Sequence, residues 1–263
     1  MTIYFLGGGN MTAAIVTGLI KNRDFSVHVV NRGAEKREQL AKQFQVATSA
    51  VLPPLTAQDV LVLAVKPQDM AAACKGLNAG GALLVSVAAG LSIDTLSGYL
   101  GASRRIVRAM PNTPAQIGLG ITGLYADPSV NQADCDIVEN IFSAVGEVMW
   151  LPEEGRLHAI TGVSGSGPAY IFYLLNALQQ AAQTQGFNQE DAHRLSLATF
   201  KGAVALAEQS GESFDVLQQN VTSKGGTTHE AIKTFQQHDI AQVISEGVAA
   251  CVHRSVEMSQ QFN

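Results

Sequence analysis

The most constraining feature of this sequence is a glycine triplet at 7–9, which stands between an apolar run at 3–6 and a helical stretch from Met11. The first glycine permits a tight turn, and the third lets the backbone approach a pyrophosphate with no Cβ in the way. The helix behind the turn directs its free N–H groups and positive dipole end at the same point. A strand, a glycine turn and a helix in this order are typical of a dinucleotide-binding site, although Thr12 replaces the third small residue of the usual pattern.

The end of the second predicted strand, 26–31, indicates which dinucleotide is bound. NAD-dependent enzymes usually place Asp or Glu there, where it accepts a hydrogen bond from the adenosine ribose. Here the strand ends in Asn31 and Arg32, which can donate to a 2′-phosphate and pair with it, and Lys36 or Arg37 follows a turn later. Ordinary surface basicity is the alternative, because acidic residues are interleaved. We expect NADP(H), with NAD(H) less favoured.

Apolar runs of strand length alternate with helical stretches through the first 151 residues. Five strands are predicted at 2–6, 26–31, 60–65, 83–87 and 105–109, with helices such as 11–21 and 34–44 between them. Apolar strands separated by helices indicate a parallel sheet covered on both faces. Two further strands, near 120–126 and 147–151, flank a helix from about 129. After Pro152 the chain has a helical pattern with glycine breaks. We therefore expect an α/β Rossmann-type dinucleotide-binding domain at 1–151, followed by an all-α domain at 152–263.

The helical half is expected to associate with another copy of the chain. The helix predicted at 168–184 carries bulky apolar residues on several faces, and only 15% of the chain is charged against 46% hydrophobic. Roughly 110 residues of helix make a thin core by themselves. We therefore expect this helix to be buried between subunits, in a homodimer or a larger homo-oligomer, so that the all-α domain is a dimerisation domain.

Composition excludes several classes of protein. The net charge of −5 and a pI near 5.7 argue against a nucleic-acid partner. No apolar run reaches the ~18 residues that span a membrane. The three cysteines are widely spaced and expected to be reduced, and the six histidines show no ligand spacing, so no metal is expected. The chain enters its first strand without a charged leader or cleavage site, and we expect a cytoplasmic protein with no secretory signal.

Four further segments resemble one family, the pyrroline-5-carboxylate reductases of proline biosynthesis. They are Leu63–Gln68, Arg108–Pro114, Ser164–Tyr170 and Val221–Thr228, which follow one another in the order and spacing of that family. The resemblance covers nearly the whole chain. It implies a Rossmann domain followed by a helical domain that interlocks with a second subunit. The activity it implies is the NADPH-dependent reduction of 1-pyrroline-5-carboxylate to L-proline, the last step of proline biosynthesis.

The glycine loop before residue 228 is a candidate site for the carboxylate of a small-molecule substrate. Thr227 and Glu230 fit a capping box, which predicts a helix starting at about 228. Gly225 and Gly226 free the backbone to aim N–H groups at one point, and the helix dipole adds to the attraction for an anion. A capped helix behind a flexible loop is the alternative. Many relatives carry Ala where this chain has Thr227.

The residues and the resemblance together give a set of expected site residues. By resemblance, the Thr228 hydroxyl reaches the pyrroline ring nitrogen, which makes Thr228 the candidate catalytic residue. The expected substrate-binding residues are Ser164, Ser166, Ser223, Gly225, Gly226, Thr227 and Thr228. The expected cofactor-binding residues are Gly7, Gly8, Gly9, Asn10, Met11, Asn31, Arg32, Ala64, Val65, Lys66, Pro67, Ala88 and Asn112. Two alternatives stay open: 164–167 could be a capped helix start with Pro168 in its first position, and Asn112 could hold its own turn.

A missing lysine indicates which bond is reduced. The related β-hydroxyacid dehydrogenases carry Gly-x-x-Gly-x-Gly-x-x-x-Lys, in which the lysine is the general acid/base. The glycines are present here at 162, 165 and 167, but Ile171 occupies the lysine position. A ketone needs a proton donor for its developing alkoxide, whereas an imine can enter already protonated and mainly needs placement. The sequence therefore favours C=N reduction. A hydroxyacid dehydrogenase, another imine reductase of this fold and a non-catalytic NADP(H) sensor are the alternatives.

Overall fold

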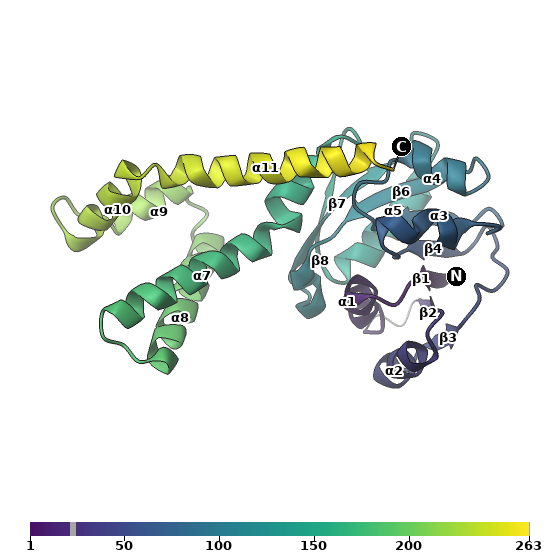
Figure 1. Ribbon diagram of the computed structural model, residues 1–263, viewed down its shortest axis with the longest axis horizontal. Helices are drawn as coiled ribbons and strands as arrows, with labels where there is room; N and C mark the ends of the chain where they lie inside the picture. The colour runs from purple at the N-terminus through teal and green to yellow at the C-terminus, as the bar shows by residue number, and fades with distance from the viewer. Residues whose placement is uncertain (22–24, 263) are drawn as a thin grey trace. The chain divides into compact units, whose positions relative to one another are not determined.

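The computed structural model describes residues 1–21 and 25–262, so Asn263, the last residue of the expected helical domain, lies outside the described residues. The chain divides into two compact units. The first unit is Met1–Pro168 together with Ala250–Asn263, and the second is Ala169–Ala249. In the described residues, the strands all belong to the first unit and the second is built from helices (Figure 1).

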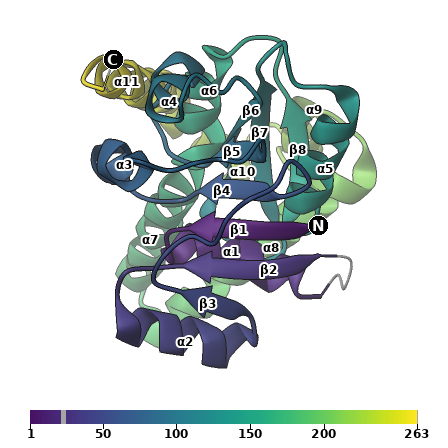
Figure 2. The ribbon, with the colours of Figure 1, turned by 90° about the vertical axis from the view of Figure 1, so that its right-hand side faces the viewer.

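Within its described residues, the first unit contains an eight-stranded sheet with the order β3-β2-β1-β4-β5-β6-β7-β8. The strands are β1 (Thr2–Leu6), β2 (Ser26–Val30), β3 (Ala47–Ser49), β4 (Val60–Leu63), β5 (Leu83–Ser86), β6 (Ile106–Met110), β7 (Gly120–Ala126) and β8 (Gly146–Trp150). Figure 2 shows β3 to β6 beside one another in this order. The chain order reverses between β1 and β4. In open α/β sheets, ligands bind at such a reversal, outside the carboxyl ends of the strands.

The expected Rossmann-type sheet is confirmed, with two differences. Neighbours from β3 to β6 pair in parallel, but β7 pairs antiparallel with β6 and β8 then pairs parallel with β7. No pairing was predicted for β7, and its antiparallel direction follows from the short connection through the 3-10 helix η1 (Thr113–Ile117), which leaves no room for a crossover. The edge strand β3 was not predicted, because its residues are half-buried or exposed and form no apolar run.

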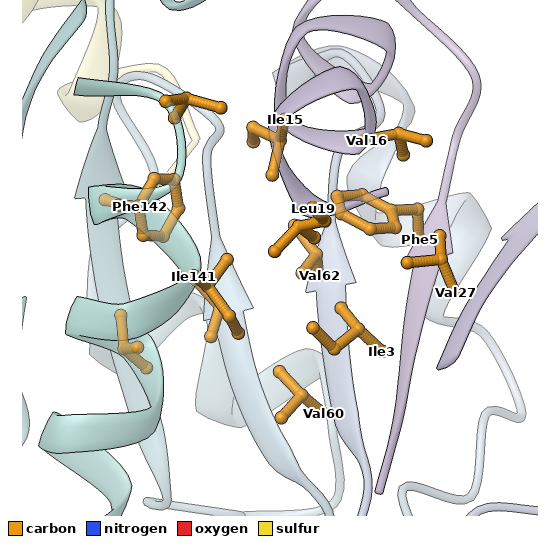
Figure 3. Packing of buried hydrophobic residues seen from close by; sticks show 14 of the residues in the cluster. Ile3, Phe5, Ile15, Val16, Leu19, Val27, Val60, Val62, Ile141 and Phe142 are labelled. Carbon is orange, nitrogen blue, oxygen red and sulfur yellow. The ribbon is translucent and has the colours of Figure 1, made fainter. Parts of the chain in front are cut away.

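Helices cover both faces of this sheet. They are α1 (Asn10–Leu19), α2 (Ala34–Phe44), α3 (Pro67–Cys74), α4 (Ile93–Tyr99), α5 (Gln132–Ser143), α6 (Arg156–Ile160) and the π-helical turn η2 (Thr161–Gly165). Alternate residues of β4 enter two hydrophobic clusters, with Val60 and Val62 in one and Leu61 and Leu63 in the other. Figure 3 shows the first cluster, in which side chains of α1 and α5 pack against those of the strands. Burial on both faces accounts for the continuous apolar runs that predicted these strands.

The glycine-rich segment at 164–167 differs from the prediction. Instead of a free helix start, α6 continues through η2 into α7 (Gly167–Thr184), and the backbone N–H of Ser166 donates to the carbonyl of Thr161 at 2.9 Å. That bond spans five residues, which defines a π turn. A Cβ at Gly165 would lie 2.8 Å from Cε of Met110, so glycine permits the close approach of this turn to β6. The predicted break between helices is therefore wrong at this position. Pro168 is the second residue of α7, not the first.

The second unit confirms the predicted all-α region. Its helices are α7, α8 (Gln189–Ser210), α9 (Phe214–Asn220), α10 (Thr227–Gln237) and α11 (Ile240–Gln260), of which α7 begins and α11 ends in the first unit. Of the described residues of this unit, Ala192 and Ser196 alone are buried. Large apolar side chains are exposed, including Phe172 (66%), Tyr173 (75%) and Phe214 (80%). Apolar surface on this scale is typical of an interface with another protein chain.

Candidate functional site

The glycine turn after β1 has the geometry that dinucleotide binding requires. Gly7 has φ +114°, and a Cβ there would lie 2.7 Å from the carbonyl oxygen of Ala64, so only glycine fits. Gly9 is the N-cap of α1 in an extended conformation, with no side-chain cap among the described residues. A Cβ at Gly9 would meet none of the described atoms within 4 Å. The backbone N–H groups that begin α1 therefore face open space, as a bound pyrophosphate needs.

The departure at Thr12 is explained by a hydrogen bond. Its side chain is fully buried, and Oγ1 donates to the carbonyl of Gly7 at 2.9 Å. Thr12 thus closes the turn from within α1. The close helix packing that a third small residue normally allows occurs instead at Gly18, where a Cβ would collide with Ala144 and Val145. Gly18 was not predicted from the sequence, because its contacts with Ala144 and Val145 join parts of the chain that lie far apart in sequence.

A groove runs from this turn along the carboxyl ends of β1 and β2. It encloses about 870 Å³ and is walled by the turn, the end of β2, the segment 50–55 and the last turn of α3. Among the described residues that line it, Arg32 and Lys75 are the charged ones, and none is acidic. A groove with apolar walls and two cations suits a flat ring system that carries phosphate.

The residues after β2 form a compact turn at one end of this groove. The Asn31 side-chain oxygen accepts from the backbone N–H of Gly33 at 2.9 Å. Nη1 of Arg37 donates to the carbonyls of Asn31 at 2.9 Å and Arg32 at 2.8 Å. The Arg32 side chain is exposed and lines the groove, whereas Nζ of Lys36 donates to the side chain of Gln39 at 3.1 Å. The structure therefore leaves Arg32 as the arginine best placed for a phosphate.

The loop after β4 lies against the glycine turn. The backbone N–H of Ala64 donates to the carbonyl of Leu6 at 2.9 Å, and Val65 lines the same groove as Gly7. Lys66 is the exposed N-cap of α3, and Pro67 begins the helix, as its missing N–H allows. Farther along the sheet, after β5, the expected cofactor residue Ala88 is buried, with 7% of its surface exposed.

Both polar atoms of the Asn112 side-chain amide form hydrogen bonds to the backbone. The side chain is buried; its oxygen accepts from the backbone N–H of Ile121 at 3.0 Å, and Nδ2 donates to the carbonyl of Ser164 at 3.2 Å. Asn112 therefore links β7 to the π turn, and neither of these bonds lies within its own turn. Cofactor contact by Asn112 stays a prediction.

Ser164 and Ser166, which were expected to bind substrate, also hold parts of the first unit together. The Ser164 hydroxyl donates to the carbonyl of Ile160 at 3.1 Å, and the Ser166 hydroxyl accepts from the thiol of Cys251 at 3.2 Å. The second of these bonds ties the π turn to α11. Each hydroxyl oxygen has further hydrogen-bonding capacity, so these bonds do not preclude a ligand.

A cluster of polar residues joins four elements of the first unit. Oε1 of Glu154 accepts from Nη1 of Arg108 and from the backbone N–H of Ile93, both at 2.8 Å. Nδ1 of His158 lies 2.9 Å from Oγ of the buried Ser255 on α11, within hydrogen-bonding distance. Burial lowers the pKa of His158, the Arg108 charge lowers it further, and Glu154 opposes both. His158 is therefore more readily neutral than an exposed histidine.

The three cysteines are free thiols, as predicted. Cys74 is fully buried, and burial raises its pKa to about 11. Burial and nearby carboxylates also raise the pKa of Cys135. These two thiols are thus poor nucleophiles, because the reactive species is the thiolate.

The loop at 221–226 precedes α10 in the second unit. Gly225 has φ +72°, and Gly226 is the extended N-cap of α10, so the helix begins at Thr227. The predicted capping box is wrong, because Gly226 takes the cap position and no side chain of the described residues caps the helix. Glu230 instead lies 3.7 Å from Lys233 in an ion pair. The uncapped N–H groups of the first turn remain available to an anion.

The expected substrate residues of this loop differ in exposure. Ser223 and Thr227 are exposed, whereas Thr228 is half-buried. The backbone N–H of Gly226 donates to the carbonyl of Ser223 at 3.0 Å, and a Cβ at Gly226 would lie 2.6 Å from Oγ of Ser223. The loop is therefore folded tightly on itself, and glycine at 226 lets the serine hydroxyl approach the helix start.

Comparison with known proteins identifies the family. Residues 154–258 match the family model described as pyrroline-5-carboxylate reductase dimerisation, and residues 2–90 match NADP oxidoreductase, coenzyme F420-dependent. The pyrroline-5-carboxylate reductase of Pseudomonas aeruginosa is 38% identical over 99% of this chain and 97% of its own length. This chain belongs to the pyrroline-5-carboxylate reductase family.

Other members of the family agree in sequence and fold. The pyrroline-5-carboxylate reductase of Vibrio alginolyticus is also 38% identical, over 99% of this chain and 98% of its own. The solved pyrroline-5-carboxylate reductase of Coxiella burnetii has a TM-score of 0.88 at 38% identity and covers 98% of both chains. The Plasmodium falciparum pyrroline carboxylate reductase, solved with NADP bound, shares the fold with a TM-score of 0.85 at 24% identity over 98% of both chains.

Across residues 1–21 and 25–262, no helix is long and apolar enough to cross a membrane. The same residues contain no group of three or more His, Cys, Asp or Glu side chains that could hold a metal ion.

Proposed function

We propose that this chain is an NADPH-dependent reductase that converts 1-pyrroline-5-carboxylate to L-proline, the last step of proline biosynthesis. The observation that carries the proposal is the 38% identity to curated pyrroline-5-carboxylate reductases over 99% of the chain. The NADP oxidoreductase model over 2–90 supports the cofactor. NADPH, when bound, supplies the reducing equivalents for the C=N bond.

The first unit offers the features that NADPH requires. We assign the pyrophosphate to the turn 7–11, where the Gly9 position is open and the N–H groups of α1 are uncapped by side chains in the described part of the chain. Asn31 and Arg32 then meet the 2′-phosphate at the end of the groove, where no acid among the lining residues opposes it. The loop 64–67 lies along the cofactor, with Ala88 and Asn112 behind the reacting end.

We assign the substrate carboxylate to the loop that begins α10. The tight fold of Ser223 on Gly226 and the uncapped first turn supply N–H groups and a positive dipole end. The hydroxyl of Thr228, half-buried in that turn, forms a hydrogen bond to the ring nitrogen. With Ile171 where hydroxyacid dehydrogenases carry a lysine, the chain binds and orients an imine that arrives protonated.

The finer statements on organisation and location are also proposals. The dimerisation model over 154–258 and the exposed apolar helices of Ala169–Ala249 support a homo-oligomer, and we propose a homodimer or an assembly of dimers. We propose that 1–151 binds the cofactor, that 152–263 provides the substrate loop and the subunit contacts, and that the protein is cytoplasmic. No nucleic acid or membrane takes part in the proposed function.

The test is an absorbance assay of NADPH oxidation by the purified protein with 1-pyrroline-5-carboxylate, combined with chromatographic detection of proline. We expect stoichiometric proline formation. A hydroxyacid dehydrogenase would instead oxidise 3-hydroxy acids, and another imine reductase would prefer a six-membered cyclic imine. A cofactor sensor would bind NADPH tightly and turn over none of these substrates, and any of these three results would refute the proposal.

A further inference from the structure

We propose that Arg37 is a positioning residue for NADPH selectivity, because its guanidinium holds the backbone of Asn31 and Arg32 in the shape that presents their side chains to the 2′-phosphate. The inference rests on the proposed function, since it takes NADPH as the cofactor. It differs from the role that the sequence suggested for this arginine, which was direct contact with the phosphate.

The contacts of one guanidinium nitrogen carry the argument. Nη1 of Arg37 donates to the carbonyls of Asn31 and Arg32 at 2.9 and 2.8 Å. An Nη atom bears two protons, and Nη1 of Arg37 donates both of them, one to each of two successive carbonyls. The β2–β3 ladder ends at the pair Val30 and Ser49, and the backbone N–H of Asn31 still donates to the carbonyl of Ser49 at 3.0 Å. The carbonyls of Asn31 and Arg32 lie beyond these strand bonds, and Arg37 is the residue that binds them.

The arginine is itself anchored to the segment that it holds. Its backbone N–H donates to the carbonyl of Gly33 at 3.1 Å, and the N–H of Gly33 donates to the Asn31 side-chain oxygen at 2.9 Å. Together with the two Nη1 bonds, these contacts tie 31–33 to the first turns of α2. The Asn31 amide is thereby directed to the glycine turn, where Nδ2 lies 2.8 Å from the position of a Cβ on Gly8.

The two arginines therefore have different roles. Arg32 is exposed and lines the groove, so it is the cation that meets a ligand. Arg37 binds the backbone carbonyl of Arg32 and thereby fixes the backbone from which the Arg32 side chain extends. A guanidinium suits this role because Nη1 holds its two protons in a fixed plane, whereas the ammonium of a lysine rotates freely.

Positioning and direct contact predict different couplings between substitutions. If Arg37 acts through the backbone of Asn31 and Arg32, its removal has no further effect on selectivity once those two side chains are absent. If it touches the phosphate directly, its removal costs the same in either background. A double-mutant cycle therefore separates the two roles.

The experiment measures the Kd of NADP+ and of NAD+ by calorimetry in four full-length proteins. These are the natural chain, Arg37→Met, the pair Asn31→Ala with Arg32→Ala, and all three substitutions together. We expect Arg37→Met to lower the preference for NADP+ about tenfold in the natural background and less than about twofold in the double variant. A tenfold loss in both backgrounds, or no loss in either, overturns the inference.

Controls address charge, folding and the proposed function. Lys42→Met removes one positive charge from an exposed position of the same helix and should leave the preference unchanged, whereas an equal loss would mean a long-range field and overturn the inference. Arg37→Gln, which carries a neutral polar side chain, replaces Arg37→Met if that variant does not fold. These measurements need no substrate, so failure of the reductase assay does not affect them. A natural chain that reduces pyrroline-5-carboxylate but binds NADP+ and NAD+ equally would overturn this inference alone.

Discussion

The two units of this chain bury their apolar side chains to very different extents. In the first unit, Phe5, Leu63 and Phe142 are fully buried, and two hydrophobic clusters fill the faces of the sheet. In the second unit, Phe172 and Tyr173 leave two thirds or more of their surface in solvent. The first unit therefore has a core of its own, whereas the second needs a partner surface to cover its helices.

This difference separates the two halves of the proposed activity. The groove for the cofactor is formed by residues of the first unit alone. The loop proposed for the substrate begins α10, a helix with no buried residue in its described length. Cofactor binding should thus be a property of the single chain, while turnover should depend on assembly. The predictions that follow test this separation, from the largest expected effect to the smallest.

Placing a charge on the exposed apolar helix α7 should have the largest effect. Tyr173→Asp is nearly neutral for an isolated chain, because the side chain is 75% exposed, but it places an unpaired charge in any interface that covers α7. We expect sedimentation velocity to show loss of the oligomer and turnover to fall by about a hundredfold or more, with the Kd of NADP+ within about threefold of the natural value. Gln43→Asp, on the exposed part of α2, is the matched control. An oligomer that survives Tyr173→Asp would break the comparison.

Removal of the Thr228 hydroxyl should affect turnover and leave cofactor binding intact. A hydrogen bond made to the reacting nitrogen is worth about a hundredfold in kcat if it strengthens in the transition state. Steady-state kinetics of Thr228→Ala should show that loss, while calorimetry shows an unchanged Kd for NADP+. Thr228→Ser keeps a hydroxyl and should retain most of the activity. Unchanged turnover in Thr228→Ala would remove this residue from the mechanism.

Two alanine substitutions in the glycine turn should separate folding from binding within the first unit. Gly7→Ala forces a residue with a Cβ to φ +114° against Ala64, so urea titration should show a loss of roughly 2–3 kcal/mol in the free energy of unfolding. Gly9→Ala meets none of the described atoms within 4 Å and should leave stability unchanged. Its Cβ should nevertheless weaken NADP+ binding, because it enters the space proposed for the pyrophosphate. Equal stability of both variants would contradict this account of the turn.

The smallest effect concerns pH and the contact between α6 and the end of α11. Burial and the Arg108 charge lower the pKa of His158 below its ordinary value of 6.5. Below that pH the unfolded chain takes up the proton more readily than the folded chain, so the free energy of unfolding falls as the pH drops below 6.5. His158→Gln should reduce this dependence in urea titrations between pH 7.5 and 5.5. Some dependence should remain, because burial also lowers the pKa of His28.

The sequence predicted the fold wherever a residue pattern determines structure locally. The apolar run 60–63 is buried on both faces, so its strand length and its continuous apolar composition identified β4. The edge strand β3 was not predicted, because an edge strand that is half-buried or exposed carries no apolar run. The π turn at Thr161–Gly165 was missed because its bonds depend on the fit of Gly165 against Met110, which lies far away in the sequence.

Within the candidate site, residue types were predictable and their contacts were not. The position of the glycine turn between a strand and a helix predicted a phosphate-binding site. The free space at Gly9 agrees with that prediction. The capping box failed because Gly226, one position earlier than predicted, took the cap in an extended conformation. The sequence grouped Arg32 with Arg37 by charge, but the structure gives only Arg37 the two backbone carbonyls.

The bond from Thr12 to Gly7 has a consequence for the thermodynamics of cofactor binding. Because the hydroxyl bonds the Gly7 carbonyl from inside the helix, this contact restrains the phosphate loop before any ligand arrives. Little conformational entropy is then lost on association, so more of the contact energy appears as affinity. Thr12→Ser keeps a hydroxyl and should preserve the affinity for the cofactor. Thr12→Val should weaken it, although valine matches the shape of threonine. The residue that departs from the glycine pattern thus supplies a restraint on the loop that a third glycine, with no side chain, could not make.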